Sequence, residues 1–126
     1  PLGRGMLTGA VGGADTLAAD DFRRSQPRFS QGNAAGNLAL LDAFRAIARE
    51  RGCTPAQLAL AWVLSRGDDV VPIPGTRSVA RLDENLDAAS VALDAATLAR
   101  IEALRLHQRV SGTRYPDMGF TMRESV

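Results

Sequence analysis

Arg77 and Arg81 are the residues of this 126-residue chain whose types and spacing best suit binding chemistry. They lie in the stretch "VVPIPGTRSVARLDEN", residues 70–85, where an apolar run meets a turn and the predicted start of a helix. Arginine carries a permanent charge and planar donors that match phosphate oxygens. A strand, a glycine turn and a helix start also direct backbone N–H groups and the helix dipole toward a bound anion. The stretch therefore predicts an anion site, although two solvated arginines at a helix start are the simpler alternative.

Three local signals should position these arginines. Val70, Val71 and Ile73 predict a short buried strand, which the Pro74-Gly75 pair ends. Ser78 predicts an N-cap, because its hydroxyl can accept an unpaired N–H of the first helical turn.

The predicted helix runs from about Val79 to Leu86. Glu84 and Asn85 follow Arg81 by three and four residues, so the three side chains should share one side of this helix.

Three further helices are predicted elsewhere in the chain. The strongest start signal is "TPAQ", in which Thr54 is the N-cap, Pro55 the first helical residue and Gln57 the partner in a capping box. Apolar residues at helical spacing predict a helix from Asn37 to a stop at Gly52, and Asp94 predicts the start of another. The glycine-rich beginning and the tail from His107 should be irregular. Helices around a strand favour an α/β protein with a parallel sheet.

Composition excludes several classes of function. The net charge is only +1, all fifteen basic residues are arginine, and they alternate with acidic residues, which argues against a nucleic-acid or membrane-binding face. The single cysteine, Cys53, cannot form an internal disulfide, and no stretch is long and apolar enough to span a bilayer, so a cytoplasmic location is expected. No metal site is expected. Because one strand cannot form a sheet, we expect the chain to be part of a longer protein.

The segments "PLGRGMLTG", "GCTPAQLALAWVLS", "VVPIPGTRSVARLDENL" and "GTRYP", in this order, resemble the last third of the aldo-keto reductases. The resemblance implies the C-terminal part of a (β/α)₈ TIM barrel, mostly helical in this chain, from an oxidoreductase that transfers hydride between the nicotinamide of NADP and an aldehyde or ketone. It implies five consecutive parts: a loop after the seventh strand (1–33), helices (34–67), the eighth strand with the cofactor loop and helix (70–86), the last helix (94–106) and the tail (107–126).

The resemblance also implies the residues that bind NADP. Those on the pyrophosphate side are Leu2, Gly3, Arg4 and Gly5. Those around the adenosine 2′-phosphate are Gly75, Thr76, Arg77 and Ser78, while Arg81, Glu84 and Asn85 would meet the adenosine end. Gly75 stands where the family often has a lysine, and Arg77 would replace that charge, which favours NADP over NAD.

No catalytic residue is assigned. The family uses a tyrosine acid with lysine, aspartate and histidine, whereas this chain has no lysine and its only tyrosine and histidine, Tyr115 and His107, lie in or beside the tail. Tyrosine has an ordinary pKa of about 10 and needs a nearby cation to act near neutral pH. We expect residues 1–126 to be inactive alone and to need the rest of the barrel or a partner chain to complete the sheet. The alternative is a non-enzymatic helical module that binds a nucleotide or another protein.

Overall fold

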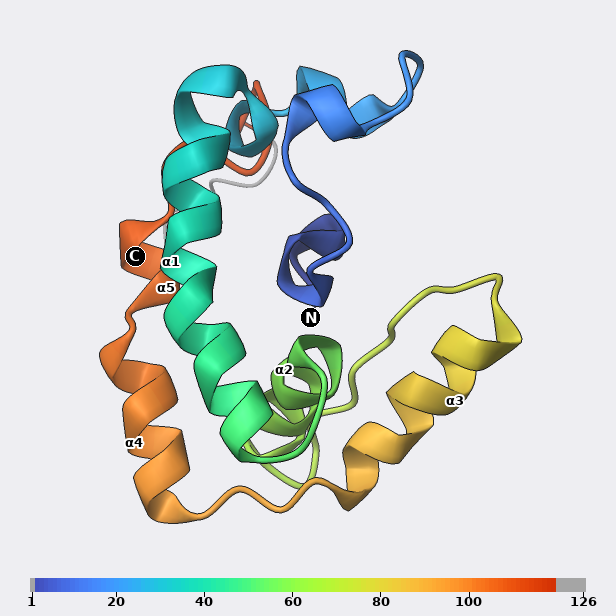
Figure 1. Ribbon diagram of the computed structural model, residues 1–126, viewed down its shortest axis with the longest axis vertical. Helices are drawn as coiled ribbons and strands as arrows, with labels where there is room; N and C mark the ends of the chain where they lie inside the picture. Colours follow the sequence, from blue (N-terminus) through green and yellow to red (C-terminus); the bar gives the residue numbers. More distant parts are fainter. Residues whose placement is uncertain (1, 120–126) are drawn as a thin grey trace.

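The computed structural model describes residues 2–119 as helices joined by 3₁₀ turns and loops (Figure 1). The α-helices are α1 (Gln31–Glu50), α2 (Pro55–Leu64), α3 (Val79–Asp87), α4 (Ala95–Ala103) and α5 (Leu106–Arg109). The 3₁₀ elements are η1 (Gly3–Thr8), η2 (Ala14–Thr16), η3 (Phe22–Ser25), η4 (Pro27–Phe29) and η5 (Ala88–Ser90). α2 is the central element, since it packs against α1, α3, η1 and η5.

The three helix starts that were predicted from capping side chains are confirmed. Thr54 and Gln57 form the capping box of α2: the Thr54 hydroxyl accepts from the N–H of Gln57 at 3.1 Å, and Gln57 Oε1 accepts from the N–H of Thr54 at 3.0 Å. Ser78 caps α3 through the N–H of Arg81, and Asp94 caps α4 through the N–H of Thr97. These caps fix where each helix begins, because each pairs an N–H that the helix itself leaves free.

The start predicted for α1 was wrong by six residues. The helix begins at Gln31 rather than at Asn37, although Gly32 and Gly36 lie in the added part. Glycine lowers helix propensity, so the local pattern favoured a loop there. Ala34 and Asn37 are buried in this part, which shows that packing overrides the local preference.

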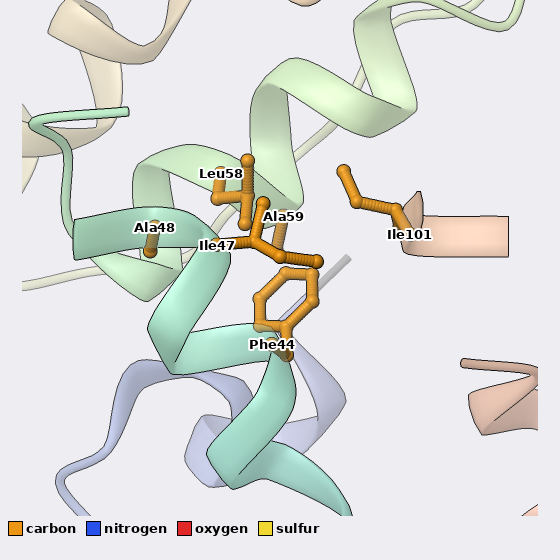
Figure 2. Close-up of a cluster of buried hydrophobic side chains, with 6 residues drawn as sticks. All are labelled: Phe44, Ile47, Ala48, Leu58, Ala59 and Ile101. Carbon is orange, nitrogen blue, oxygen red and sulfur yellow. The ribbon is translucent and has the colours of Figure 1, made fainter. Parts of the chain in front are cut away.

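The main core lies where α1, α2 and α4 meet (Figure 2). Figure 2 shows side chains from α1 and α2 converging, with Ile101 of α4 approaching from a third side. The buried members are Phe44, Ile47, Ala48, Leu58, Ala59 and Ile101.

A second buried cluster joins the N-terminal segment to α1 through Met6, Val11, Leu17, Phe29 and Leu41. The segment predicted as loop is thus a packed layer of 3₁₀ turns.

The buried strand predicted at residues 70–73 does not form within residues 2–119, where no strand is present. Val71 and Ile73 are 78% and 85% exposed, so the expectation of burial was also wrong for these residues. A strand needs a neighbour to pair its N–H and C=O groups, and the described residues offer none. Figure 1 shows this stretch as an extended link that carries α3 away from α1.

The tail from His107 was predicted to be irregular, but its first residues belong to the short helix α5, and only the part from Val110 to residue 119 is without helix. It returns to α1 and the N-terminal layer, where Ser111 accepts a hydrogen bond from Asn37 of α1 and Gly112 accepts one from Arg28 of η4. Among residues 2–119, no helix combines the length and hydrophobicity needed to cross a membrane.

Candidate functional site

A small pocket lies between η1, the beginning of α2 and the first turns of α3. Its volume is about 140 Å³. We call it the Arg81 pocket; its lining residues are Leu2, Thr8, Ala10, Ala56, Gly75, Thr76, Arg81, Glu84 and Asn85. Polar and apolar groups both line it, as suits a ligand with a charged part and a flat part.

Side chains of α2 and of the turn before α3 hold one wall of the Arg81 pocket in place. Gln57, whose Oε1 completes the α2 cap, donates from Nε2 to the carbonyl of Glu84 at 3.2 Å and so joins α2 to α3. The Thr76 hydroxyl accepts from the N–H of Ser78 at 3.2 Å, and the Ser78 hydroxyl accepts from the N–H of Arg81 at 3.4 Å. These bonds fix the turn before α3 and the rotation of α3, which sets the direction of Arg81 and Glu84.

The structure brings together six of the eleven residues predicted for the cofactor site: Leu2, Gly75, Thr76, Arg81, Glu84 and Asn85. The prediction missed Thr8, Ala10 and Ala56. Ala56 follows Pro55 at the capped start of α2, so the capping signal could have indicated it. Thr8 and Ala10 had no sequence signal, because their place in the wall depends on contacts between η1 and α2.

Five predicted residues do not line this pocket: Gly3, Arg4, Gly5, Arg77 and Ser78. Ser78 instead caps α3, and Arg77 is exposed. Within residues 2–119, neither Arg77 nor Arg81 forms an ion pair or a side-chain hydrogen bond, so both guanidinium groups have free donors.

Arg4 points away from the Arg81 pocket and toward the tail. Its Nη1 donates to the carbonyl of Arg114 at 2.6 Å and to Gln26 Oε1 at 3.1 Å. Its Cζ lies 4.2 Å from the centre of the Tyr115 ring and 5.8 Å from that of Phe22. A direct contact between the Arg4 side chain and a pyrophosphate therefore finds no support in the geometry.

The ionisable groups near the Arg81 pocket suit binding better than acid–base chemistry. The lining contains one guanidinium, Arg81, and one carboxylate, Glu84, but no histidine, cysteine or tyrosine. Burial raises the pKa of the Cys53 thiol, which packs against the main core, so this cysteine has a structural environment and not a reactive one. Among the described residues, no cluster of three or more histidine, cysteine, aspartate or glutamate side chains could hold a metal ion.

A separate, apolar cavity of about 250 Å³ lies between α1, α2, α4 and α5. Phe44, Trp62 and Ile101 line it, and none of the predicted site residues does. Trp62 lies at the rim of this cavity. Its Nε1 donates to Glu102 Oε1 at 3.2 Å, and the Arg66 Cζ lies 4.7 Å from the centre of its ring. Trp62 also packs against the main core, so its role is in packing.

Comparisons with known proteins agree on one family. The model of the "Aldo/keto reductase family" matches residues 1–106. The chain is 46% identical over 116 residues to Aldo-keto reductase yakc of Schizosaccharomyces pombe, whose name includes NADP(+), covering 92% of this chain and 34% of that protein. It is 36% identical over 125 residues to Aldo-keto reductase str7 of Strobilurus tenacellus, covering 99% of this chain and 37% of that protein.

The chain thus spans about a third of the length of these relatives. No solved structure matches it significantly. The family model matches residues 1–106, which are most of this chain, and this shows that the chain belongs to the aldo/keto reductase family.

Proposed function

We propose that residues 1–126 form the C-terminal, cofactor-binding part of a (β/α)₈ barrel in an NADP-dependent aldo-keto reductase. The parent reaction is hydride transfer between the nicotinamide and an aldehyde or ketone. The observation that carries the proposal is the Arg81 pocket, which gathers six residues chosen from sequence motifs that lie far apart in the chain.

The size and the polar groups of the Arg81 pocket fit one end of a dinucleotide. Complete small-molecule sites are typically ~300–1,000 Å³, so a pocket of about 140 Å³ accepts only part of such a ligand. Arg81 provides charge for a phosphate, while Glu84 and Asn85 offer an acceptor and an amide for the edge of a flat base. The remainder of the ligand belongs against parts of the barrel outside this chain.

These residues bind and orient the cofactor and take no part in the chemical step. When bound, the cofactor supplies or accepts the hydride. Arg77 and Arg81 hold its phosphate end, and the α3 start adds the positive end of a helix dipole. Since the chain has no lysine to support a tyrosine acid, residues 1–126 alone should be inactive.

A non-enzymatic interaction module is the second candidate. The specific observation in its favour is an apolar surface on the 70–86 segment: Val71, Ile73, Val79, Leu82 and Leu86 are all exposed. Exposed apolar patches of this kind mark contacts with other chains or other parts of the same protein.

The test uses the complete protein that contains residues 1–126 and titrates NADPH and NADH by calorimetry at fixed ionic strength. Arg77→Ala should weaken NADPH about tenfold to a hundredfold more than NADH, because only NADPH carries the 2′-phosphate and a charge-assisted contact has about this value. Arg81→Ala should weaken both if it acts on adenine, and chiefly NADPH if it also contacts the phosphate.

Arg49→Ala on α1 is the matched control, since it removes an exposed helical arginine outside the Arg81 pocket and should change neither affinity. Residues 1–126 alone should oxidise no NADPH in the presence of an aldehyde. Equal losses for the two cofactors with Arg77→Ala would contradict the phosphate role. Absence of any dinucleotide binding by the complete protein would favour the interaction module.

A further inference from the structure

Residues 111–115 of the tail return to the N-terminal layer and are held there from two sides. We call this arrangement the tail clasp; it consists of Arg4, Asn37, Ser111, Arg114 and Tyr115. Asn37 is only 2% exposed, and its amide forms two bonds with Ser111: Nδ2 donates to the carbonyl at 2.9 Å, and Oδ1 accepts from the N–H at 2.7 Å. A buried amide whose two ends are satisfied by one residue fixes that residue in place.

Arg4 forms the other half of the tail clasp. Its guanidinium donates to the carbonyl of Arg114 and covers the Tyr115 ring, so it holds both the backbone and a side chain of the tail. The same Nη1 atom donates to Gln26 Oε1, and Gln26 is 2% exposed. The carbonyl of Arg4 accepts from Arg23 Nη1 at 3.1 Å, which holds its backbone as well.

The backbone of Arg4 needs such support. Its φ and ψ of 57° and 35° lie in the left-handed region, which is unfavourable for a residue with a side chain, and it interrupts η1 there together with Gly5. A conformation of this kind persists only where the surrounding contacts impose it. The shape of η1 therefore depends on the tail clasp.

The two sides of the Arg81 pocket are supported differently. Leu2 and Thr8, just before and at the end of η1, line the pocket, and the N–H groups of Gly5 and Leu7 both donate to the carbonyl of Leu2. A movement of Arg4 is thereby transmitted to this wall. The opposite wall, from Gly75 to Asn85, is held by Gln57 and by the cap of α3, outside the clasp.

We infer that the tail clasp positions the η1 wall of the Arg81 pocket and thereby sets how long a bound NADPH remains. The inference rests on the proposed function, since it deepens the role of the same site. Arg4 and Tyr115 are positioning residues in it: they touch each other and not the ligand. Loosening a wall chiefly speeds the escape of a bound ligand, so the effect belongs in the dissociation rate.

The experiment measures NADPH dissociation by stopped-flow fluorescence in the complete protein that contains residues 1–126. Tyr115→Leu removes the aromatic face and should raise the dissociation rate about threefold to tenfold, the loss expected for a cation–π contact. Tyr115→Phe keeps the face and should stay within about twofold of the unchanged protein. Arg4→Gly should resemble Tyr115→Leu, and glycine tolerates the left-handed backbone, so this variant retains the fold.

A second measurement needs no ligand. Hydrogen exchange at the amides of Gly5, Leu7 and Gly9 in the cofactor-free protein should be faster in Tyr115→Leu and Arg4→Gly but not in Tyr115→Phe. If the unchanged protein binds NADPH and Tyr115→Leu releases it at the same rate, the inference is wrong and the proposed function stands. If the unchanged protein binds no NADPH, the proposed function is wrong, and the role of the tail clasp in NADPH retention is wrong with it. Hydrogen exchange then shows whether the tail clasp still orders η1.

Discussion

At the scale of single residues, Arg4 and Arg81 show what a sequence can and cannot reveal about a side chain. Both were predicted to meet a cofactor, and only Arg81 lines the pocket. Its place in the first turn of α3 follows from a local signal, because Ser78 caps that helix. The direction of Arg4 follows from Gln26 and from a tail residue 110 positions away. No local pattern carries such a contact.

The Asp21–Arg23 pair, which supports Arg4 from the other side, gives a prediction about pH. Asp21 accepts from the Arg23 guanidinium and from its N–H, and these bonds lower the pKa of the Asp21 carboxyl from 3.8 to about 2. The folded state therefore binds this proton less readily than the unfolded chain. The stability that Asp21 contributes is present above its ordinary pKa and is lost as the pH falls through the folded pKa.

We expect the difference in unfolding midpoint between the unchanged protein and Asp21→Asn to shrink as the pH falls from about 4 to about 2, in a series of thermal melts of the complete protein. Glu50 and Asp94 also have lowered pKa values, but they are common to both proteins and cancel in the difference. A difference that stays constant over this range would show that Asp21 does not act through its charge.

At the scale of elements, the helix caps were predictable and the contacts between elements were not. Thr54, Ser78 and Asp94 each mark a helix start by a side chain that bonds within three residues, so sequence alone was sufficient. The early start of α1 depends on packing of Ala34 and Asn37, and the strand at residues 70–73 would need a neighbour. Whether that segment is the eighth strand of the parent barrel stays a prediction.

Thr54→Ala should destabilise the complete protein by about 1 kcal/mol, the usual value of a side-chain cap. The change removes the hydroxyl that accepts from the N–H of Gln57. The backbone N–H of residue 54 still donates to Gln57 Oε1, so one of the two hydrogen bonds of the capping box remains. Urea denaturation should show a lower midpoint with an unchanged slope. Thr54→Ser retains the hydroxyl and should be close to the unchanged protein; a loss of equal size for serine would assign the effect to the methyl group instead of the cap.

At the scale of the whole molecule, the described residues have two buried clusters and one uncovered apolar surface. The clusters join α1 to α2 and to the N-terminal layer. The uncovered surface follows residues 70–86, where no described element packs on Val71, Ile73 or Val79 deeply enough to bury them. The relatives are about three times longer than this chain, so the surface has the character of a face that other parts of a barrel would cover.

The chain of residues 1–126, produced alone, should therefore associate as its concentration rises. Val71 and Ile73 lie in an extended stretch without strand partners, and apolar side chains beside unpaired backbone groups favour pairing between chains. The double variant Val71→Thr and Ile73→Thr keeps the β-branched shape but adds hydroxyls, and it should reduce the average mass measured by light scattering toward that of a monomer. Leu64→Thr, which changes an exposed apolar residue on α2 outside this surface, should leave association unaltered. A monomer at every concentration, with a sharp cooperative melt, would show that the exposed surface needs no partner.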